Sequence, residues 1–257
     1  LSLGVFMFKL IVFQFFFFVS LFAQDCSDLY PEGLPTQPVD KVLCKKFFVV
    51  GYSYDTKTPL WAVEKLQKDN NRSRLGLGGF RYKRDYALAK KYRSTSSDYA
   101  YSTQDRSQLV PFDNVNTDHT ASVETFLMSN IAPQDATLNR NGWIYLERGV
   151  RDLANVYGEV HVVTGVAFLN DKNSKVERIG TNKVAVPTHY YKAVYALHTA
   201  DGPKMWAWIV PNKAIDYKKM KNYRTTVDNL EKILNINLFP SLEQPFQENI
   251  EGKVAPL

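Results

Sequence analysis

Hydrophobic and polar residues alternate in several stretches of the chain, which predicts β-strands there. Residues 46–54 are rich in β-branched and aromatic types, and residues 60–66 resume the alternation after a turn-forming stretch, so the two form a predicted hairpin. Three later strands are predicted over 159–169, 183–197 and 204–210. A turn around Gly202-Pro203 joins the last two.

A helical period dominates residues 139–157. The large apolar residues recur there at steps of three and four, which predicts one core-facing stripe: Trp143, Leu146, Val150, Leu153 and Tyr157. Gly158 ends this helix. A second helix is predicted over 226–234, and 123–131 is either a short helix or an extended segment. Residues 94–104 and the last twenty residues have no clear period and are predicted to be irregular.

The first residues form an apolar run that is typical of a targeting segment. Residues 6–23 carry one charge, Lys9, and end in Ser-Leu-Phe-Ala, a suitable peptidase site. The run is short for a membrane span with flanking anchors. We predict a signal peptide over 1–23, with Met7 as the start of translation, and therefore an exported protein without membrane contact after leader removal. An uncleaved N-terminal anchor is the alternative.

The two cysteines, Cys26 and Cys44, bracket a proline-rich stretch just after the leader. Because an exported protein meets oxidising conditions, we predict a Cys26–Cys44 disulfide that ties an N-terminal arm, 24–45, to the first strand. Free thiols and a lipid on Cys26 are the alternatives. Two cysteines without a nearby histidine make a poor metal site.

Length and charge narrow the picture further. A chain of 257 residues can form one domain with a large core, which we assign to 46–240, followed by a loose tail over 241–257. The formal net charge of +6 suits a polyanionic partner, and it equally suits a protein whose charge serves only solubility. Basic residues and aromatic residues interleave in 67–93, so Arg81 and Arg84 are candidate phosphate contacts. An ordinary solvated loop is the alternative.

Two motifs in the middle of the chain carry a family resemblance. Residues 105–108 read Asp-Arg-Ser-Gln, and 129–151 contain a Ser-Asn-Ile-Ala-Pro-Gln turn and a helix with Glu147 and Arg151 one turn apart. This order resembles the signature of the sugar-nonspecific DNA/RNA endonucleases, which is Asp-Arg-Gly-His, Ser-Asn-Ile-x-Pro-Gln and Leu-Asn-x-Gly-x-Trp…Glu…Arg. The resemblance spans about 46–240 and includes Val-Pro-Thr-His-Tyr-Tyr-Lys at 186–192. Such length and order are more specific than a four-residue match.

The resemblance implies an α+β fold of the ββα-metal nuclease type. Its central, mostly antiparallel sheet would be flanked by helices, with the metal site on the helix that starts near Asn139. It also implies a divalent cation, Mg²⁺ with Mn²⁺ as the alternative, and DNA and RNA as partners. Whether the protein forms a homodimer is left open.

The resemblance assigns roles to residues of this helix. Asn139 would be the metal ligand, Glu147 would orient a metal-bound water, and Arg151 would contact the scissile phosphate. The motif carries one extra residue between Asn139 and Gly142. Without the family pattern, these residues would be no more than a helix start and an exposed ion pair.

The chain departs from the signature at the residue that performs the chemistry. The family histidine is Gln108 here, and the family glycine is Ser107, whereas Arg106 keeps its place and is expected to support the structure or orient the phosphate. A neutral imidazole accepts a proton from water near pH 7, and a carboxamide does not. Loss of general-base catalysis costs typically about 10²–10⁴-fold in rate. His119, expected in a loop, is the alternative base.

Two function hypotheses follow. The first is an exported, metal-dependent endonuclease that hydrolyses phosphodiester bonds of DNA and RNA and is impaired by Gln108. The second is an inactive pseudo-nuclease that binds nucleic acid or a protein partner. A sequencing error at position 108 is a third possibility, although Ser107 would then need a second change.

Overall fold

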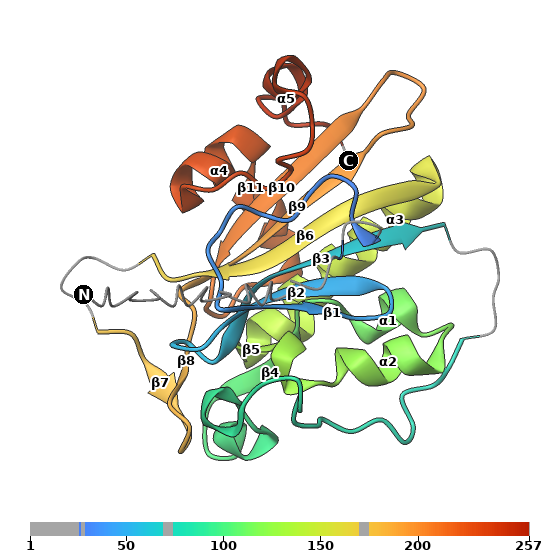
Figure 1. The fold of residues 1–257 in the computed structure, drawn as a ribbon. Coiled ribbons are helices and arrows are strands. Elements are labelled where there is room, and N and C mark those ends of the chain that lie inside the picture. Colours follow the sequence, from blue (N-terminus) through green and yellow to red (C-terminus); the bar gives the residue numbers. More distant parts are fainter. Residues whose placement is uncertain (1–25, 27–28, 69–73, 170–174, 257) are drawn as a thin grey trace, which may run out of the picture.

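A seven-stranded antiparallel sheet forms the centre of the molecule (Figure 1). The computed structural model describes residues 26, 29–68, 74–169 and 175–256, so the predicted leader lies outside the described residues. The strand order is β1-β2-β3-β6-β9-β10-β11. In chain order these strands are Lys41–Cys44, Phe48–Ser53, Thr58–Gln67, Glu159–Ala167, His189–Ala196, Lys204–Pro211 and Arg224–Thr225.

Both faces of this sheet are covered, which explains why its strands are buried almost throughout. Successive side chains of a strand point to opposite faces. On β3, Ala62 and Leu66 join one apolar layer, and Trp61 and Val63 join the other. The second layer also contains Tyr30 of the N-terminal arm.

Each face carries its own helices. The first face packs against α1 (Phe112–Val115), α2 (His119–Thr125) and α3 (Ile144–Tyr157). The second face packs against α4 (Val227–Leu234) and α5 (Gln244–Ile250). Figure 1 shows α4 and α5 beside the β10 and β11 end of the sheet, away from α1 and α2.

A separate two-stranded ribbon precedes the long helix. Strand β4 (Gln104–Gln108) pairs antiparallel with β5 (Ile131–Asp135), and α1, α2 and a 3₁₀ turn lie between them in the chain. After β5 the chain enters a π-helical turn, Leu138–Trp143, which continues directly into α3. The predicted apolar stripe is confirmed, because Trp143, Leu146, Val150 and Leu153 are buried in the first layer.

Several boundaries differ from the sequence prediction. The predicted strand 183–197 is two strands, β8 (Val184–Ala185), which pairs with β7 (Arg178–Ile179), and β9. Strands β1, β4 and β5 and helix α1 were not predicted. The tail prediction for 241–257 fails at α5 and at residues near 255, where the Ala255 amide donates to Met205 O.

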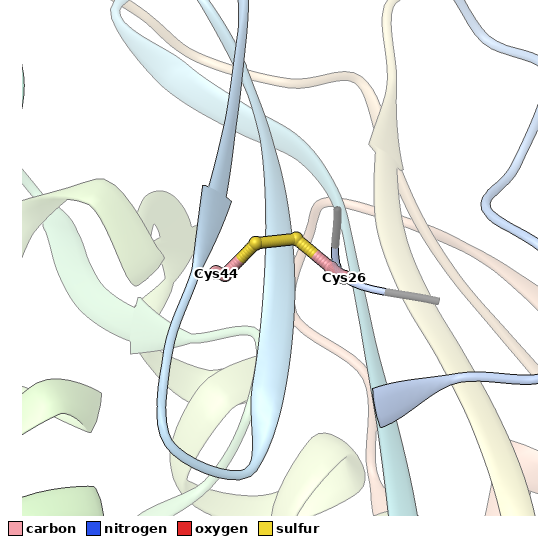
Figure 2. The surroundings of a disulfide bond; sticks show 2 residues. All are labelled: Cys26 and Cys44. Carbon is pink, nitrogen blue, oxygen red and sulfur yellow. A yellow bond between two sulfur atoms is a disulfide. The ribbon is translucent and has the colours of Figure 1, made fainter. Parts of the chain in front are cut away.

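The predicted disulfide is present between Cys26 and Cys44, whose Cα atoms lie 5.8 Å apart (Figure 2). It joins the beginning of the described chain to the last residue of β1. The arm between them packs on the second face, where Gln37 O accepts the indole hydrogen of Trp61 at 3.4 Å. In the described part of the chain, no helix combines the length and apolarity that a membrane crossing requires.

Candidate active site

Strand β4 carries the Asp-Arg-Ser-Gln motif along one edge of the site. Asp105 lies opposite Gln134 and Gln108 opposite Ile131, so the two motif residues stand near opposite ends of the ribbon. Strand alternation also turns their side chains to opposite faces. Asp105 therefore faces the start of the π-helical turn, and Gln108 faces the α1–α2 segment.

Asn139 lies in the first turn after β5 and is held by Asp105. Its Nδ2 donates to Asp105 Oδ2 at 2.9 Å. Arg140 clamps the same carboxylate with two hydrogen bonds of 2.7 Å from Nε and Nη2. Although partial burial opposes ionisation, the hydrogen bonds from Arg140 and Asn139 lower the pKa of Asp105. This carboxylate is consequently committed to orienting Asn139.

The orientation of Asn139 fits a cation ligand. With Nδ2 donating to Asp105, the Oδ1 atom of the carboxamide is the end that can accept, and it has no hydrogen bond to the described residues. A carbonyl-type oxygen next to an anchored amide suits a hard cation that keeps most of its waters. The structure thus fits the predicted role of Asn139.

The chain is π-helical from Leu138 to Trp143 and keeps the signature's spacing from asparagine to tryptophan, with the glycine one position later. A π turn closes i→i+5 hydrogen bonds and accommodates one more residue than an α turn. Gly142 is needed inside it, because a Cβ there would come within 3.0 Å of Ile215 O. The Asn141 Oδ1 atom accepts from Tyr217 N at 3.0 Å, which fixes the widened turn against the following segment.

Gln108 is tied to the main chain at both ends of its carboxamide. Its Nε2 donates to Thr125 O at 3.0 Å, and its Oε1 accepts from Phe112 N at 2.9 Å. These bonds join the end of β4 to the first turn of α1 and the last residue of α2. Gln108 and Asn139, the two predicted site residues, share no hydrogen bond and are held by different partners.

Asn130 reinforces the same junction. Its carboxamide accepts from Val110 N and donates to Val110 O and Thr125 O, each at 3.0 Å. The conformation of the loop after β4 is therefore fixed by two side-chain amides, Gln108 and Asn130. Sequence analysis assigned Asn130 only to a turn.

Glu147 and Arg151 lie on α3 above a charged network that sequence analysis missed. Arg151 Nη1 donates to Asn114 Oδ1 at 3.0 Å, and Asn114 Nδ2 donates to Glu64 Oε1 at 2.8 Å. Glu64 on β3 and Lys192 on β9 are only 3% and 1% exposed. A sequence signal existed, since each interrupts an otherwise apolar strand at a buried position.

Lys192 sits at the centre of this network. Its ammonium group donates to Thr164, which lies directly opposite on β6, and stands 5.4 Å from the centre of the Trp143 ring. Burial lowers the pKa of Lys192, while the charges of Glu147 and Glu64 oppose that shift. The network therefore links the sheet to the functional face of α3.

The two glutamates have pKa values near neutrality. Burial raises the pKa of Glu147 to about 7, although Lys192 and Arg151 act against it. Burial likewise raises the pKa of Glu64 to about 7, against Lys192 and the hydrogen bond from Asn114. Lys192 thus acts electrostatically on both carboxyl groups.

The remaining predicted residues contact other groups or are exposed. Arg106 donates to Ser96 Oγ at 2.7 Å and stacks on Tyr82, at 4.8 Å from the ring centre. Arg81 and Arg84 are exposed. His119 is exposed as well, but it begins α2 and does not lie in a loop, with its ring beside Phe80 at 5.7 Å.

Three pockets are lined in part by basic side chains. A pocket of about 370 Å³ opens at Arg151 and includes Arg74, Lys65 and Lys68. A second, of about 410 Å³, contains Arg81, Lys83 and His119, and a third, of about 570 Å³, contains Arg84 and Tyr86. Cationic and aromatic side chains in such hollows can contact phosphates and bases. None of these pockets includes Asn139.

The family model of the DNA/RNA non-specific endonucleases matches residues 25–244 of this chain. The chain belongs to this family. Mitochondrial endonuclease G of Bos taurus is 30% identical over 224 residues, covering 84% of this chain and 74% of its own length. Nuclease C1 of Cunninghamella echinulata var. echinulata is 30% identical over 208 residues, covering 77% of this chain and 82% of its own length.

The solved structures agree with this assignment. A chain in a crystal structure of the EndoG/EndoGI complex, which concerns the inhibition of EndoG, matches with a TM-score of 0.75 and 28% identity. The match covers 85% of this chain and 92% of that chain. The predicted ββα-metal nuclease fold is thereby confirmed. Members of this family are nucleases, which act on nucleic acids and use a divalent metal.

Proposed function

We propose that the protein is an exported, divalent-cation-dependent endonuclease of DNA and RNA whose hydrolysis is strongly impaired by Gln108. The observation that carries this proposal is the commitment of both ends of the Gln108 carboxamide to main-chain groups. A carboxamide has no basic lone pair that accepts a proton at neutral pH. Gln108 in this arrangement supports the loop and leaves the attacking water without a base.

The remaining groups can still bind and position a substrate. Asn139 would hold the cation, Mg²⁺ or Mn²⁺, which when bound offsets the charge that develops on the phosphate. Glu147 would orient water on the cation, and Arg151 is suited to paired hydrogen bonds with phosphate oxygens. Arg81 and Arg84 would extend the contact along the nucleic-acid backbone.

Export is supported by two independent features. The leader pattern at 1–23 predicts translocation, and the Cys26–Cys44 disulfide suits an oxidising compartment. Mass spectrometry of the protein recovered outside the producing cells checks this part of the proposal. A mass that still includes residues 7–23 would support an uncleaved N-terminal anchor and contradict a cleaved signal peptide.

Digestion of supercoiled plasmid and of RNA, with Mg²⁺ or Mn²⁺, tests the proposed chemistry. We expect Gln108→His to raise the cleavage rate about 10²–10⁴-fold over the wild type, because an imidazole restores the base. Asn139→Ala in the Gln108→His background should abolish this gain. Gln108→Asn is the matched control, since it changes the side chain without supplying a base.

The outcomes separate the two functions. Slow, cation-dependent cutting by the wild type supports an impaired enzyme. The second candidate, a pseudo-nuclease that binds nucleic acid or a protein partner, is favoured by the same Gln108 bonds, and it is supported if the wild type never cuts while Gln108→His does. If neither cuts, the proposed role of Asn139 is wrong. If His119→Ala removes the cutting by the wild type, His119 is the general base in place of Gln108.

A further inference from the structure

Three carboxyl groups meet on the side of the sheet that faces away from α3. One oxygen from each of Asp228, Glu231 and Glu251 lies within 4.8 Å of the others. Asp228 and Glu231 are three residues apart on α4 and so share one face of that helix. Glu251 follows α5 directly.

Glu251 is the unusual member of this group, because it is buried and one of its carboxyl oxygens has no hydrogen-bond partner. The residue is only 3% exposed, and its Oε1 atom has no hydrogen bond to the described residues. Its neighbourhood is fixed against α4: Glu251 O accepts from Asp228 N at 3.3 Å, and a Cβ on Gly252 would lie 3.0 Å from Asp228 Oδ2. The buried carboxylate therefore faces the other two.

The electrostatic setting of the three groups favours a cation. None of them forms an ion pair with a lysine or arginine of the described residues. Glu251 also stands at the C-terminal end of α5, where the helix dipole is negative. Burial and the neighbouring carboxylates raise the pKa of Glu251 to about 8. Some positive species, either a proton or a metal ion, has to compensate these charges.

The spacing of the three oxygens is suitable for Ca²⁺. Two oxygens on the same Ca²⁺, each at about 2.3–2.6 Å, can be at most about 5 Å apart, whereas two oxygens on Mg²⁺ can be at most about 4.2 Å apart. The three oxygens satisfy the limit for Ca²⁺. Ca²⁺ also tolerates irregular geometry and fills its remaining positions with water or main-chain oxygens.

We propose that Asp228, Glu231 and Glu251 form a Ca²⁺ site separate from the cation site at Asn139. The bound ion would join α4 to the segment that follows α5. That segment already contacts the sheet, since Trp206 Nε1 donates to Pro256 O at 2.7 Å and Arg224 donates to Ala255 O. The site therefore stabilises the C-terminal end of the fold and takes no part in hydrolysis.

Thermal unfolding of the EDTA-treated full chain, titrated with CaCl₂ at pH 7.5, tests the proposal. We expect the midpoint temperature to rise by about 5–10 °C when Ca²⁺ reaches 100 times its dissociation constant. Glu251→Gln and Asp228→Asn should each abolish the rise. Asp228 is exposed, so its variant stays informative even if Glu251→Gln folds poorly.

Asn139→Ala serves as the control for the other cation site. It should keep the full Ca²⁺ response, and the two carboxamide variants should keep the cleavage rate of their parent protein. Equal Ca²⁺ responses in the wild type and in Glu251→Gln would overturn the proposal. So would a wild type that does not respond to 10 mM Ca²⁺, on the order of ten times the weakest expected dissociation constant; the carboxyl groups would then be compensated by protons alone.

Discussion

Lys192 is a charged residue that the fold holds away from water beneath the functional helix. Its Nζ atom donates a hydrogen bond to Thr164 and lies over the ring of Trp143. The negative charges of Glu147 and Glu64 favour its protonated form. Removing a buried charge leaves the opposite charges near it uncompensated, which destabilises the folded state. Lys192 is thus a residue whose effect on stability depends on the charge of its neighbours.

We predict that Lys192→Met destabilises the protein by about 3–5 kcal/mol at pH 8. The loss should be smaller at pH 5, because carboxyl groups with a pKa of about 7 are then protonated and need no counter-charge. Urea denaturation at both pH values measures this. The double variant Glu64→Gln/Lys192→Met should recover part of the loss at pH 8. An equal loss at both pH values would show that packing, not charge, dominates.

At the scale of secondary-structure elements, the disulfide and β1 act together. Cys44 ends the edge strand β1, and Cys26 is buried in the second apolar layer. A cross-link over a sequence separation of 18 residues restricts the unfolded chain and holds the arm on the sheet. The edge strand consequently depends on a covalent bond as well as on its ladder with β2.

We predict that Cys26→Ser/Cys44→Ser lowers the unfolding free energy by about 3 kcal/mol and the midpoint temperature by about 6–12 °C. Thermal unfolding with and without dithiothreitol measures this. Reductant should move the wild type to the midpoint of the variant and leave the variant unchanged. A variant as stable as the wild type would mean that the arm stays docked without the bond.

The sequence predicted those elements whose pattern reflects burial. Helix α3 carries a complete apolar stripe, and β2 and β3 have β-branched alternation. Strands β4 and β5 could not be predicted, because the first is polar throughout and the second contains Pro133. Helix α2 has a mostly polar sequence without a clear apolar stripe. Its start is fixed by Asp118, whose side chain accepts a hydrogen bond from Ala121 N.

Sequence motifs predicted only those site residues that lie close together along the chain. Asn139, Glu147 and Arg151 lie on one continuous helix, so a motif describes them. The pairing of β3, β6 and β9 brings Glu64 and Lys192 near the residues of α3. This pairing joins distant parts of the chain, so no local sequence pattern predicts it. The hydrogen bonds of Gln108 depend in the same way on how α1 and α2 return to the end of β4.

At the scale of the whole molecule, two buried and two partly buried carboxyl groups set the pH dependence. The pKa is raised to about 7 for Glu64, Glu147 and Glu231 and to about 8 for Glu251, with burial as the main cause. These groups stay protonated in the folded state at pH values where the unfolded chain has released the protons. Stability therefore falls as pH rises through this range.

We predict that the unfolding free energy of the metal-free protein decreases from pH 6.5 to pH 8. Below pH 6.5 His189 acts in the opposite direction, because burial lowers its pKa, so the upper window is the clearer one. Urea denaturation in EDTA at pH 6.5, 7.25 and 8 measures the slope. Glu251→Gln should make it shallower. A free energy that rises over this window would contradict the assignment.

The distribution of charge leads to a prediction about binding. Arg81 and Arg84 are exposed beside two of the hollows. If each neutralises one phosphate, Arg81→Ala and Arg84→Ala should each reduce the slope of log affinity against log salt by about 0.9 for duplex DNA and about 0.7 for single strands. Fluorescence anisotropy in EDTA measures this without cutting. Lys232→Ala on α4 is the matched control and should leave the slope unchanged.

The π turn at Leu138–Trp143 also determines how the residues of α3 are rotated about the helix axis relative to Asn139. Each residue of an α-helix advances the azimuth by about 100°, so adding or removing one residue upstream rotates everything downstream by that amount. A residue removed from this turn can be absorbed by a return to α-helical geometry, whereas a residue removed from the α-helical part turns Glu147 and Arg151 about the axis relative to Asn139. In the proposed site, where Asn139, Glu147 and Arg151 act together, this turn is therefore the segment of the helix that tolerates a change of length.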